Sequence, residues 1–269
     1  MNKKYLIFTD LDLTIYPECK IMPREIIDYF NKLAKLGNMV VLCTGRPLTG
    51  SKYIYDLFSN KLILACDNGT RILKPYDSSF KKINSSININ SLHSLIQRIK
   101  DGIYMMLTIG EKDIYGYNLD KAPFWMFHKL EDSKLFDDIN FTANIKEDIT
   151  LLNLYIYPEY IDYFNSIISD YPELKVFNWG IERDGVYCLE IYSNSGDKSF
   201  AVKELKKLYP EYISFAFGDQ LNDIPMLKEA DFGVAISNAR QEVKDIADYI
   251  TEYDCDNLGV IRFLEKVIK

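Results

Sequence analysis

The sequence YLIFTDLDLT, residues 5–14, runs from an apolar segment directly into two carboxylates. A short apolar run bounded by polar residues is typical of a buried strand, and the two acids mark where that strand ends. Apolar side chains at helical spacing follow over residues 26–36, and Gly37 is a natural end for that helix. The order strand, acids, helix predicts the first unit of an α/β fold.

The same alternation continues along the chain. Apolar strands are predicted at residues 39–43 and 62–66, with a helix between them that ends near residue 58. From residue 196 the pattern resumes, with helices predicted over 199–208, from 224, over 243–247 and from 258, and strands over 213–217, 232–236 and 249–251. Strands that alternate with helices imply a parallel sheet flanked by helices.

The middle of the chain has a different order of predicted helices and strands. A polar run at residues 81–90 leads into predicted helices over 92–99, 123–130 and 160–169 and strands over 104–109, 151–157, 175–179 and 186–192. The last two strands flank Asp184-Gly185, a hairpin turn signal. We therefore predict a discontinuous α/β core domain, residues 1–83 and 195–269, interrupted by an α+β cap domain, residues 84–194.

Composition narrows the class of protein. The 269 residues include 48% hydrophobic residues, the balance of a globular chain, and the 39 acids against 32 bases argue against a nucleic-acid partner. The longest apolar runs are five residues, too short for a membrane span or a signal peptide, so a cytoplasmic location is expected. The five cysteines and two histidines lack the spacing of a zinc site, and the oligomeric state is not readable.

Polar groups gather where the predicted strands end. They are Asp10 and Asp12, Thr44-Gly45-Arg46, Asp67-Asn68-Gly69, and Gly218-Asp219 with Asn222-Asp223. Because the carboxyl ends of parallel strands meet at one edge of a sheet, we expect these groups to converge. The four aspartates at 10, 12, 219 and 223 would repel one another unless a cation lies among them, and hard oxygen ligands favour Mg²⁺. One Asp-x-Asp is more often a turn or a helix cap, but the whole set predicts a Mg²⁺ site that binds a phosphate.

These motifs resemble those of a known family. Asp10-x-Asp12-x-Thr14, Thr44-Gly45-Arg46-Pro47, Asn68-Gly69, Lys198 and Gly218-Asp219-x-x-Asn222-Asp223 are similar to the haloacid dehalogenase superfamily of phosphatases, most of all its Cof-type branch with a type II, subtype B cap. The resemblance covers both core segments nearly end to end, whereas in the cap it rests on size and layout. It implies a Rossmann-like parallel-sheet core with an inserted α+β cap domain.

The resemblance also implies roles for individual residues. Asp10 would take the phosphoryl group as an aspartyl-phosphate, and Asp12 would protonate the leaving oxygen and then activate water. Thr44 and Lys198 would hold the phosphoryl oxygens as further catalytic residues. The expected phosphate-binding residues are Thr44, Gly45, Arg46, Lys198 and Asn222, and the expected Mg²⁺ ligands are Asp10, Asp12 through its main-chain carbonyl, Asp219 and the supporting Asp223.

The chain departs from the family pattern in two places. Leu13 and Ser199 stand where the family usually has glycine, but neither change removes a reacting group. Two interpretations of Arg46 stay open: contact with the substrate or with an acid of the cap, and an ion pair on the protein's own surface. In the cap, Trp125, Phe127 and Trp179 either stack on a sugar or pack internally, and Arg183 and Glu190 are candidates to face the crevice.

The sequence thus predicts a phosphoric monoester hydrolase. We expect a Mg²⁺-dependent phosphatase that acts on a small phosphorylated metabolite, such as a sugar phosphate, with the cap selecting the leaving group. No nucleic acid and no membrane is expected as a partner. Two alternatives remain, a phosphosugar mutase of related architecture and a non-catalytic module that binds a phosphometabolite.

Overall fold

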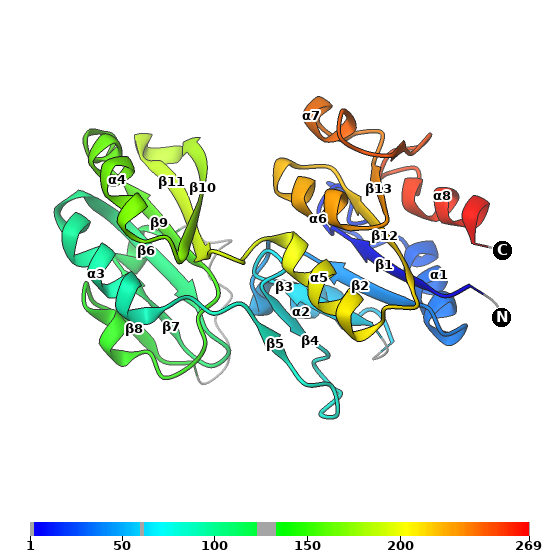
Figure 1. The fold of residues 1–269 in the computed structure, drawn as a ribbon, viewed down its shortest axis with the longest axis horizontal. Helices are drawn as coiled ribbons and strands as arrows, with labels where there is room; N and C mark the ends of the chain where they lie inside the picture. The colour runs from blue at the N-terminus through cyan, green and yellow to red at the C-terminus, as the bar shows by residue number, and fades with distance from the viewer. Residues whose placement is uncertain (1–2, 60–61, 123–132, 269) are drawn as a thin grey trace. The chain divides into compact units, whose positions relative to one another are not determined.

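The structure is a computed structural model that describes residues 3–59, 62–122 and 133–268. It divides into two compact units (Figure 1). The first unit comprises Met1–Ile83 and Asp197–Lys269, and the second comprises Asn84–Gly196. The predicted aromatic helix at residues 123–130, which carries Trp125 and Phe127, lies outside the described residues.

The first unit is built on a sheet with eight strands in the described part of the chain, in the order β14-β13-β12-β1-β2-β3-β4-β5. Neighbouring strands from β14 to β3 pair in parallel, and β4 pairs antiparallel with β3. The strands are β1 (Tyr5–Thr9), β2 (Met39–Cys43), β3 (Ile63–Cys66), β4 (Arg71–Leu73), β5 (Ile83–Asn84), β12 (Ile213–Gly218), β13 (Phe232–Ala235) and β14 (Tyr249–Ile250).

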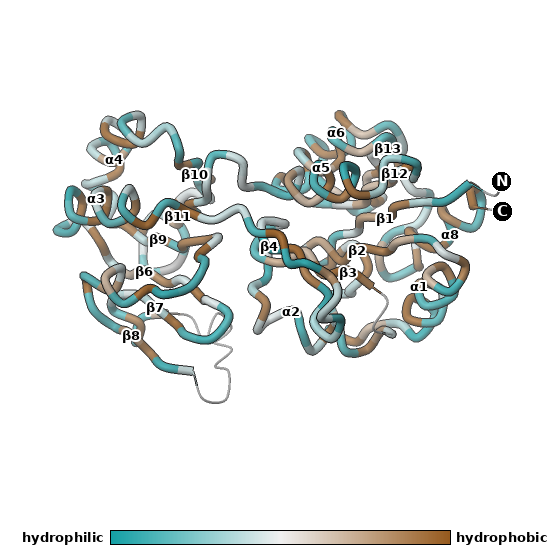
Figure 2. The backbone as a smooth tube through the Cα atoms, turned by 60° about the horizontal axis from the view of Figure 1, so that its bottom comes forward, coloured by the Kyte–Doolittle hydropathy of each residue, from teal (hydrophilic) through white to brown (hydrophobic). Residues whose placement is uncertain are grey.

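Helices cover both faces of this sheet. One face packs against α1 (Arg24–Lys35), α2 (Leu48–Tyr55) and α8 (Gly259–Val267), and the other against α5 (Lys198–Leu208), α6 (Ile224–Glu229) and α7 (Gln241–Lys244). Successive side chains of β1 point to opposite faces, so Ile7 belongs to one core cluster and Leu6 and Phe8 to the other. Both faces being buried explains why β1, β2 and β3 are continuous apolar runs (Figure 2).

The strand order fixes where the functional groups meet. β1 lies between β12 and β2, with Thr9 in register with Phe217 and with Leu42. Because these strands run in the same direction, the loops after β12, β1, β2 and β3 leave from one edge of the sheet. The polar groups at the strand ends are therefore neighbours, although they are up to 213 positions apart in the sequence (Asp10 to Asp223).

The second unit is an α+β layer. Its sheet has the order β10-β11-β9-β6-β7-β8, and α3 (Ile89–Ile99) and α4 (Ile161–Ile167) pack on one face through a shared apolar cluster. The strands are β6 (Ile103–Ile109), β7 (Ile114–Tyr117), β8 (Leu135–Asp137), β9 (Leu152–Ile156), β10 (Leu174–Ile181) and β11 (Tyr187–Ser193). The predicted hairpin is confirmed, because β10 and β11 pair antiparallel across a turn in which Asp184 and Gly185 have φ values of 59° and 69°.

The predicted fold class, an α/β parallel-sheet core with an inserted α+β region, is confirmed. The strands β4, β5, β7 and β8 were not predicted, because they are only two to four residues long and carry no long apolar run. The polar run at 81–90 contains β5 and the start of α3, and the helix predicted at 243–247 spans Gln241–Lys244 instead. Within the described residues, no helix combines the length and the apolar character that crossing a membrane requires.

Candidate active site

Three buried carboxylates meet at the edge of the core sheet. Asp10 follows β1, whereas Asp219 and Asp223 follow β12, and each offers an oxygen within 4.8 Å of the others. The N–H of Asp10 donates to the carbonyl of Phe217 at 2.9 Å, which ties the end of β1 to β12. Three acids in a buried site are unfavourable unless positive charge accompanies them.

Lys198 supplies part of that charge. Its side chain is 1% exposed, and Nζ donates to Oδ1 of Asp10 at 2.6 Å and to Oδ1 of Asp223 at 2.5 Å. Burial alone would lower the pKa of Lys198, but the charges of Asp10 and Asp223 raise it above its usual value. Lys198 therefore stays protonated. The helix α5 begins at this residue, where the Asp197 side chain accepts from the N–H of Ser199 at 2.8 Å.

One lysine does not balance three carboxylates, and the remaining negative charge shows in their pKa values. Burial, opposed by Lys198 and reinforced by Asp223 and Asp219, raises the pKa of Asp10 well above its usual value. Burial and the charge of Asp223 raise the pKa of Asp219 to about 6, although its Oδ1 accepts from the Thr14 hydroxyl at 2.9 Å. An all-oxygen donor set with surplus negative charge fits a hard divalent cation such as Mg²⁺.

The backbone around Asp223 holds its carboxylate in place. Its Oδ2 accepts from the N–H groups of Asp219 and Gln220, both at 2.9 Å, as part of a capping box at the short 3-10 helix Leu221–Asp223. A Cβ on Gly218 would lie 2.4 Å from the Cβ of Asp223. Glycine is therefore required at residue 218 for the chain to fold back on itself this closely.

The Asp12 carboxylate lies outside the three-acid cluster. Arg46 donates to it with Nε and Nη2, both at 2.7 Å, and Lys20 donates to Oδ1 at 3.0 Å. Burial alone would raise the pKa of Asp12, but hydrogen bonds and charge from Arg46 and then Lys20 lower it. Asp12 is thus held as a carboxylate, the form that acts as a base.

Arg46 is itself held from several sides. Its guanidinium lies over the rings of Tyr16 and Tyr53, at 5.5 and 6.0 Å from their centroids. Nη1 donates to the Tyr53 hydroxyl at 2.8 Å and to the carbonyl of Gly50 at 3.2 Å. In this conformation, and among the described residues, the carboxylate partner of Arg46 is Asp12 of the same unit, and not an acid of the cap.

The remaining predicted residues lie in the loops after β2 and β12. Thr44 is buried, and its hydroxyl oxygen accepts from the N–H of Arg46 at 3.1 Å. Asn222 donates from Nδ2 to Oδ1 of Asn68 at 3.0 Å, and Nδ2 would lie 3.6 Å from a Cβ on Gly45. The structure thus places Thr44, Gly45, Asn222 and Asn68 in adjoining loops.

One residue that shapes the site, Asn238, was given no role there from the sequence. Asn238 donates to the carbonyl of Leu13 at 2.9 Å and accepts from the N–H of Cys255 at 2.9 Å, so it ties the loop after β1 to the C-terminal region. Leu13 has φ 59°, the left-handed conformation that glycine adopts at little cost. The family glycine at this position was a signal for that conformation, but nothing in the sequence linked Asn238 to it.

The candidates in the second unit have local partners. Trp179 is 38% exposed, and its ring lies 4.6 Å from that of Phe177 between centroids. Glu190 accepts a hydrogen bond from the Tyr192 hydroxyl. The side chain of Arg183 lies outside the described part of the structure.

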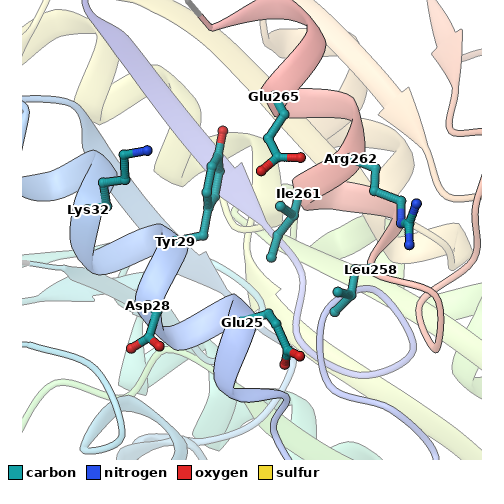
Figure 3. A pocket seen from close by; sticks show the side chains of 8 residues that line it. All are labelled: Glu25, Asp28, Tyr29, Lys32, Leu258, Ile261, Arg262 and Glu265. Atoms are coloured by element: carbon teal, nitrogen blue, oxygen red, sulfur yellow. The ribbon is translucent and has the colours of Figure 1, made fainter.

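A pocket of about 520 Å³ lies between α1 and α8 and shares no lining residue with the acid cluster (Figure 3). It is lined by Glu25, Asp28, Tyr29, Lys32, Leu258, Ile261, Arg262 and Glu265. Three carboxylates against two cations do not favour an anionic ligand, and none of the residues predicted for the site lines it. The acid cluster at the sheet edge is therefore the better candidate for phosphate chemistry.

The raised pKa of Asp219 predicts how this carboxylate affects stability. An acid whose pKa rises to about 6 on folding costs stability when it is ionised, so the cost is complete above pH 6 and absent below about pH 4. We expect Asp219→Asn to stabilise the metal-free protein by about 1–3 kcal/mol at pH 7, and the gain to vanish near pH 4, measured by urea unfolding. Asp231 is the matched control. Burial alone would raise its pKa, but Lys206 and Ser214 lower it. Asp231→Asn should destabilise at pH 7, and equal losses in both variants would contradict the assignment.

The left-handed conformation of Leu13 leads to a second prediction. An L-residue in this conformation costs about 1 kcal/mol relative to glycine, so we expect Leu13→Gly to hold or raise the melting temperature despite the loss of a half-buried side chain. Leu36→Gly, at an ordinary φ of −78°, should lower it. A fall in the melting temperature of Leu13→Gly as large as that of Leu36→Gly would show that strain at residue 13 is negligible.

Comparison with known proteins identifies the family of this chain. A family model described as haloacid dehalogenase-like hydrolase matches residues 7–264. The 5-amino-6-(5-phospho-D-ribitylamino)uracil phosphatase YitU of Bacillus subtilis (strain 168) is 26% identical over 268 residues, which cover 98% of each chain. A haloacid dehalogenase-like hydrolase structure from Bacteroides thetaiotaomicron covers 98% of this chain and 100% of its own, with a TM-score of 0.78 and 23% identity.

A subclass IIB sugar phosphatase of the same superfamily has a TM-score of 0.72 and 19% identity, covering 98% of this chain and 99% of its own. The predicted family is thereby confirmed, and the predicted enzyme class, phosphoric monoester hydrolases, is that of the named phosphatase relative. The chain belongs to the haloacid dehalogenase-like hydrolases.

Proposed function

We propose that this protein is a Mg²⁺-dependent phosphatase that hydrolyses a small phosphomonoester through an aspartyl-phosphate on Asp10. The observation that carries the proposal is the buried cluster of Asp10, Asp219 and Asp223 with Lys198 among them. A buried carboxylate beside a protonated lysine and a surplus of acidic oxygens is suited to phosphoryl transfer, in which positioning and charge stabilisation do most of the work.

The first step uses the side chains in distinct roles. Lys198 binds Oδ1 of Asp10, so we assign Oδ2 to attack phosphorus. The new Oδ2–P bond forms as the ester P–O bond breaks, and the leaving oxygen takes a proton from Asp12. Lys198 and the Thr44 hydroxyl stabilise the charge on the phosphoryl oxygens. A bound Mg²⁺, held by Asp10, the Asp12 carbonyl and Asp219 with Asp223 in support, would supply Lewis-acid stabilisation of that charge.

The second step needs Asp12 as a base. Water attacks phosphorus and gives its proton to Asp12, the Oδ2–P bond breaks, and inorganic phosphate leaves. The bidentate hydrogen bonds from Arg46 hold Asp12 in the ionised form that this step requires. Protonating the leaving group in the first step requires Asp12 to leave this pairing and to take up a proton from solvent beforehand.

For the substrate, we propose a polyhydroxylated phosphomonoester such as a sugar or sugar-alcohol phosphate. The name of the Bacillus subtilis relative specifies a phosphoribityl substrate, and one structure with the same fold is called a sugar phosphatase. Both names describe a phosphate on a chain or ring of hydroxyl groups. These resemblances support a substrate class and no single compound.

Asp10→Asn is the direct test of the nucleophile. We expect the variant to lose at least about 10³-fold in kcat because an amide oxygen does not form the phosphoenzyme. The measurement is phosphate release from a panel of sugar and polyol phosphates, with Mg²⁺ and with a chelator. Asp231→Asn removes a carboxylate that also pairs with a lysine at 2.6 Å, and it should leave kcat unchanged.

The panel also separates the alternatives. An isomerised sugar phosphate without phosphate release would indicate a mutase. Chelator-insensitive binding of phosphorylated compounds without turnover of any of them would indicate a binding module, and either result would overturn the phosphatase proposal.

The intermediate has a test of its own. Asp12→Asn removes the base of the second step, so with p-nitrophenyl phosphate, whose leaving group needs little protonation, the phosphoenzyme should accumulate. Borohydride reduces an aspartyl-phosphate to homoserine, which peptide mass spectrometry would locate at residue 10. The double variant carrying Asp10→Asn as well should give no homoserine. Homoserine at a residue other than 10 would contradict the assigned roles. So would an Asp12→Asn enzyme that turns over the substrate but yields no homoserine.

A further inference from the structure

The loop after β3 has an unusual backbone. Asp67, Asn68 and Gly69 are three consecutive residues in the left-handed region, with φ values of 51°, 58° and 80°. Two of them are not glycine; Asp and Asn enter this region more readily than other residues, but each still carries a conformational cost that surrounding contacts offset. One such contact is the buried ion pair between Asp67 Oδ2 and Arg71 Nε, at 2.7 Å, in which neither side chain is more than 3% exposed.

This loop contacts the other loops of the proposed active site. The N–H of Asn68 donates to the carbonyl of Thr44 at 2.9 Å, and the N–H of Asp67 donates to the carbonyl of Arg46 at 2.9 Å. Asn68 Oδ1 accepts from Asn222 Nδ2 at 3.0 Å. One loop is therefore bonded to the loops that follow β2 and β12.

Its closest approach is to Lys198. A Cβ built on Gly69 would lie 2.8 Å from the Cα of Lys198, 3.3 Å from Sγ of Cys43 and 3.4 Å from the carbonyl oxygen of Asp197. A Cβ does not come within 3.0 Å of a backbone atom without displacing it. The first residue of α5 thus packs directly against the backbone of Gly69, which has no side chain.

We propose that Asn68 and Gly69 are positioning residues for the phosphoryl-binding groups, a role that rests on the proposed function. Neither supplies a reacting atom. Gly69 sets where the backbone of Lys198 lies, and Asn68 sets where Thr44 and Asn222 lie relative to it. Lys198 Nζ is 2.6 Å from Asp10 and 2.5 Å from Asp223, so a backbone shift at residue 198 moves the ammonium group relative to both carboxylates.

The test compares two glycines of the same unit with the same backbone conformation. Gly37 has φ 87°, close to the 80° of Gly69, but a Cβ there meets only the flexible end of the Lys4 side chain, at 3.2 Å. Gly37→Ala therefore carries the conformational cost of a left-handed alanine without touching the site. Gly69→Ala carries the same cost and also displaces Lys198.

We expect Gly69→Ala to lower kcat/KM on p-nitrophenyl phosphate at least tenfold and to weaken binding of inorganic phosphate in Mg²⁺, measured by calorimetry, at least fivefold. Gly37→Ala should keep both within twofold, and its melting temperature should fall by no more than that of Gly69→Ala. In case Gly69→Ala does not fold, Asn68→Gly keeps the left-handed backbone and removes the side chain together with its hydrogen bond to Asn222. It should lower kcat/KM at least threefold at an unchanged or higher melting temperature.

The outcomes separate this inference from the proposed function. If the unmodified protein turns over substrate and Gly69→Ala or Asn68→Gly matches it in kcat/KM and phosphate binding, the positioning role is wrong and the phosphatase proposal stands. If the unmodified protein turns nothing over but binds phosphate, and Gly69→Ala weakens that binding more than Gly37→Ala does, the positioning role stands without the phosphatase. Absence of both turnover and phosphate binding overturns both.

Discussion

The ammonium group of Lys198, buried among Asp10, Asp219 and Asp223, is the interaction on which the rest of this site depends. Without it, three carboxylates would be buried with no positive charge among them, and the edge of the sheet would be strongly unfavourable. With it, the cluster keeps a surplus of negative charge, and burial together with the neighbouring carboxylates raises the pKa values of Asp10 and Asp219. The same surplus that costs stability in the metal-free chain is what makes the cluster a suitable cation site.

The surrounding structure serves mainly to hold that ammonium group and those carboxylates in register. The N–H of Asp10 is bonded to β12, the Asp223 carboxylate is bonded to the backbone that carries Asp219, and α5 places Lys198 against the loop after β3. Glycine at 218 and 69 permits approaches that no side chain would allow. Rigid elements thus carry the charged groups, and the loops between them are locked by backbone contacts.

Much of this arrangement can be predicted from the sequence, for a physical reason. Buried parallel strands must be apolar on both faces, and polar groups can follow them only at their ends, so the runs at β1, β2 and β12 identify both the sheet and its functional edge. The acids of the cluster were found in this way. The partners of Asp12 were not, because Arg46, Lys20, Tyr16 and Tyr53 meet only through the fold, and a local pattern does not specify which cation reaches which carboxylate. The short strands β4 and β5 were missed because pairing with neighbours, and not their own side chains, defines them.

The discontinuity of the core has a consequence for how the chain folds. β1 pairs with β12, and Tyr5 lies opposite Ile213, so the centre of the first sheet closes a loop of more than 200 residues. The sheet of the second unit lies wholly within residues 84–196 and pairs strands much closer together in sequence. Contacts of long sequence separation form slowly, and chains are synthesised from the N-terminus. The inserted unit is therefore able to fold while β1 still lacks one neighbour, and the buried charges come together only after almost the entire chain has left the ribosome.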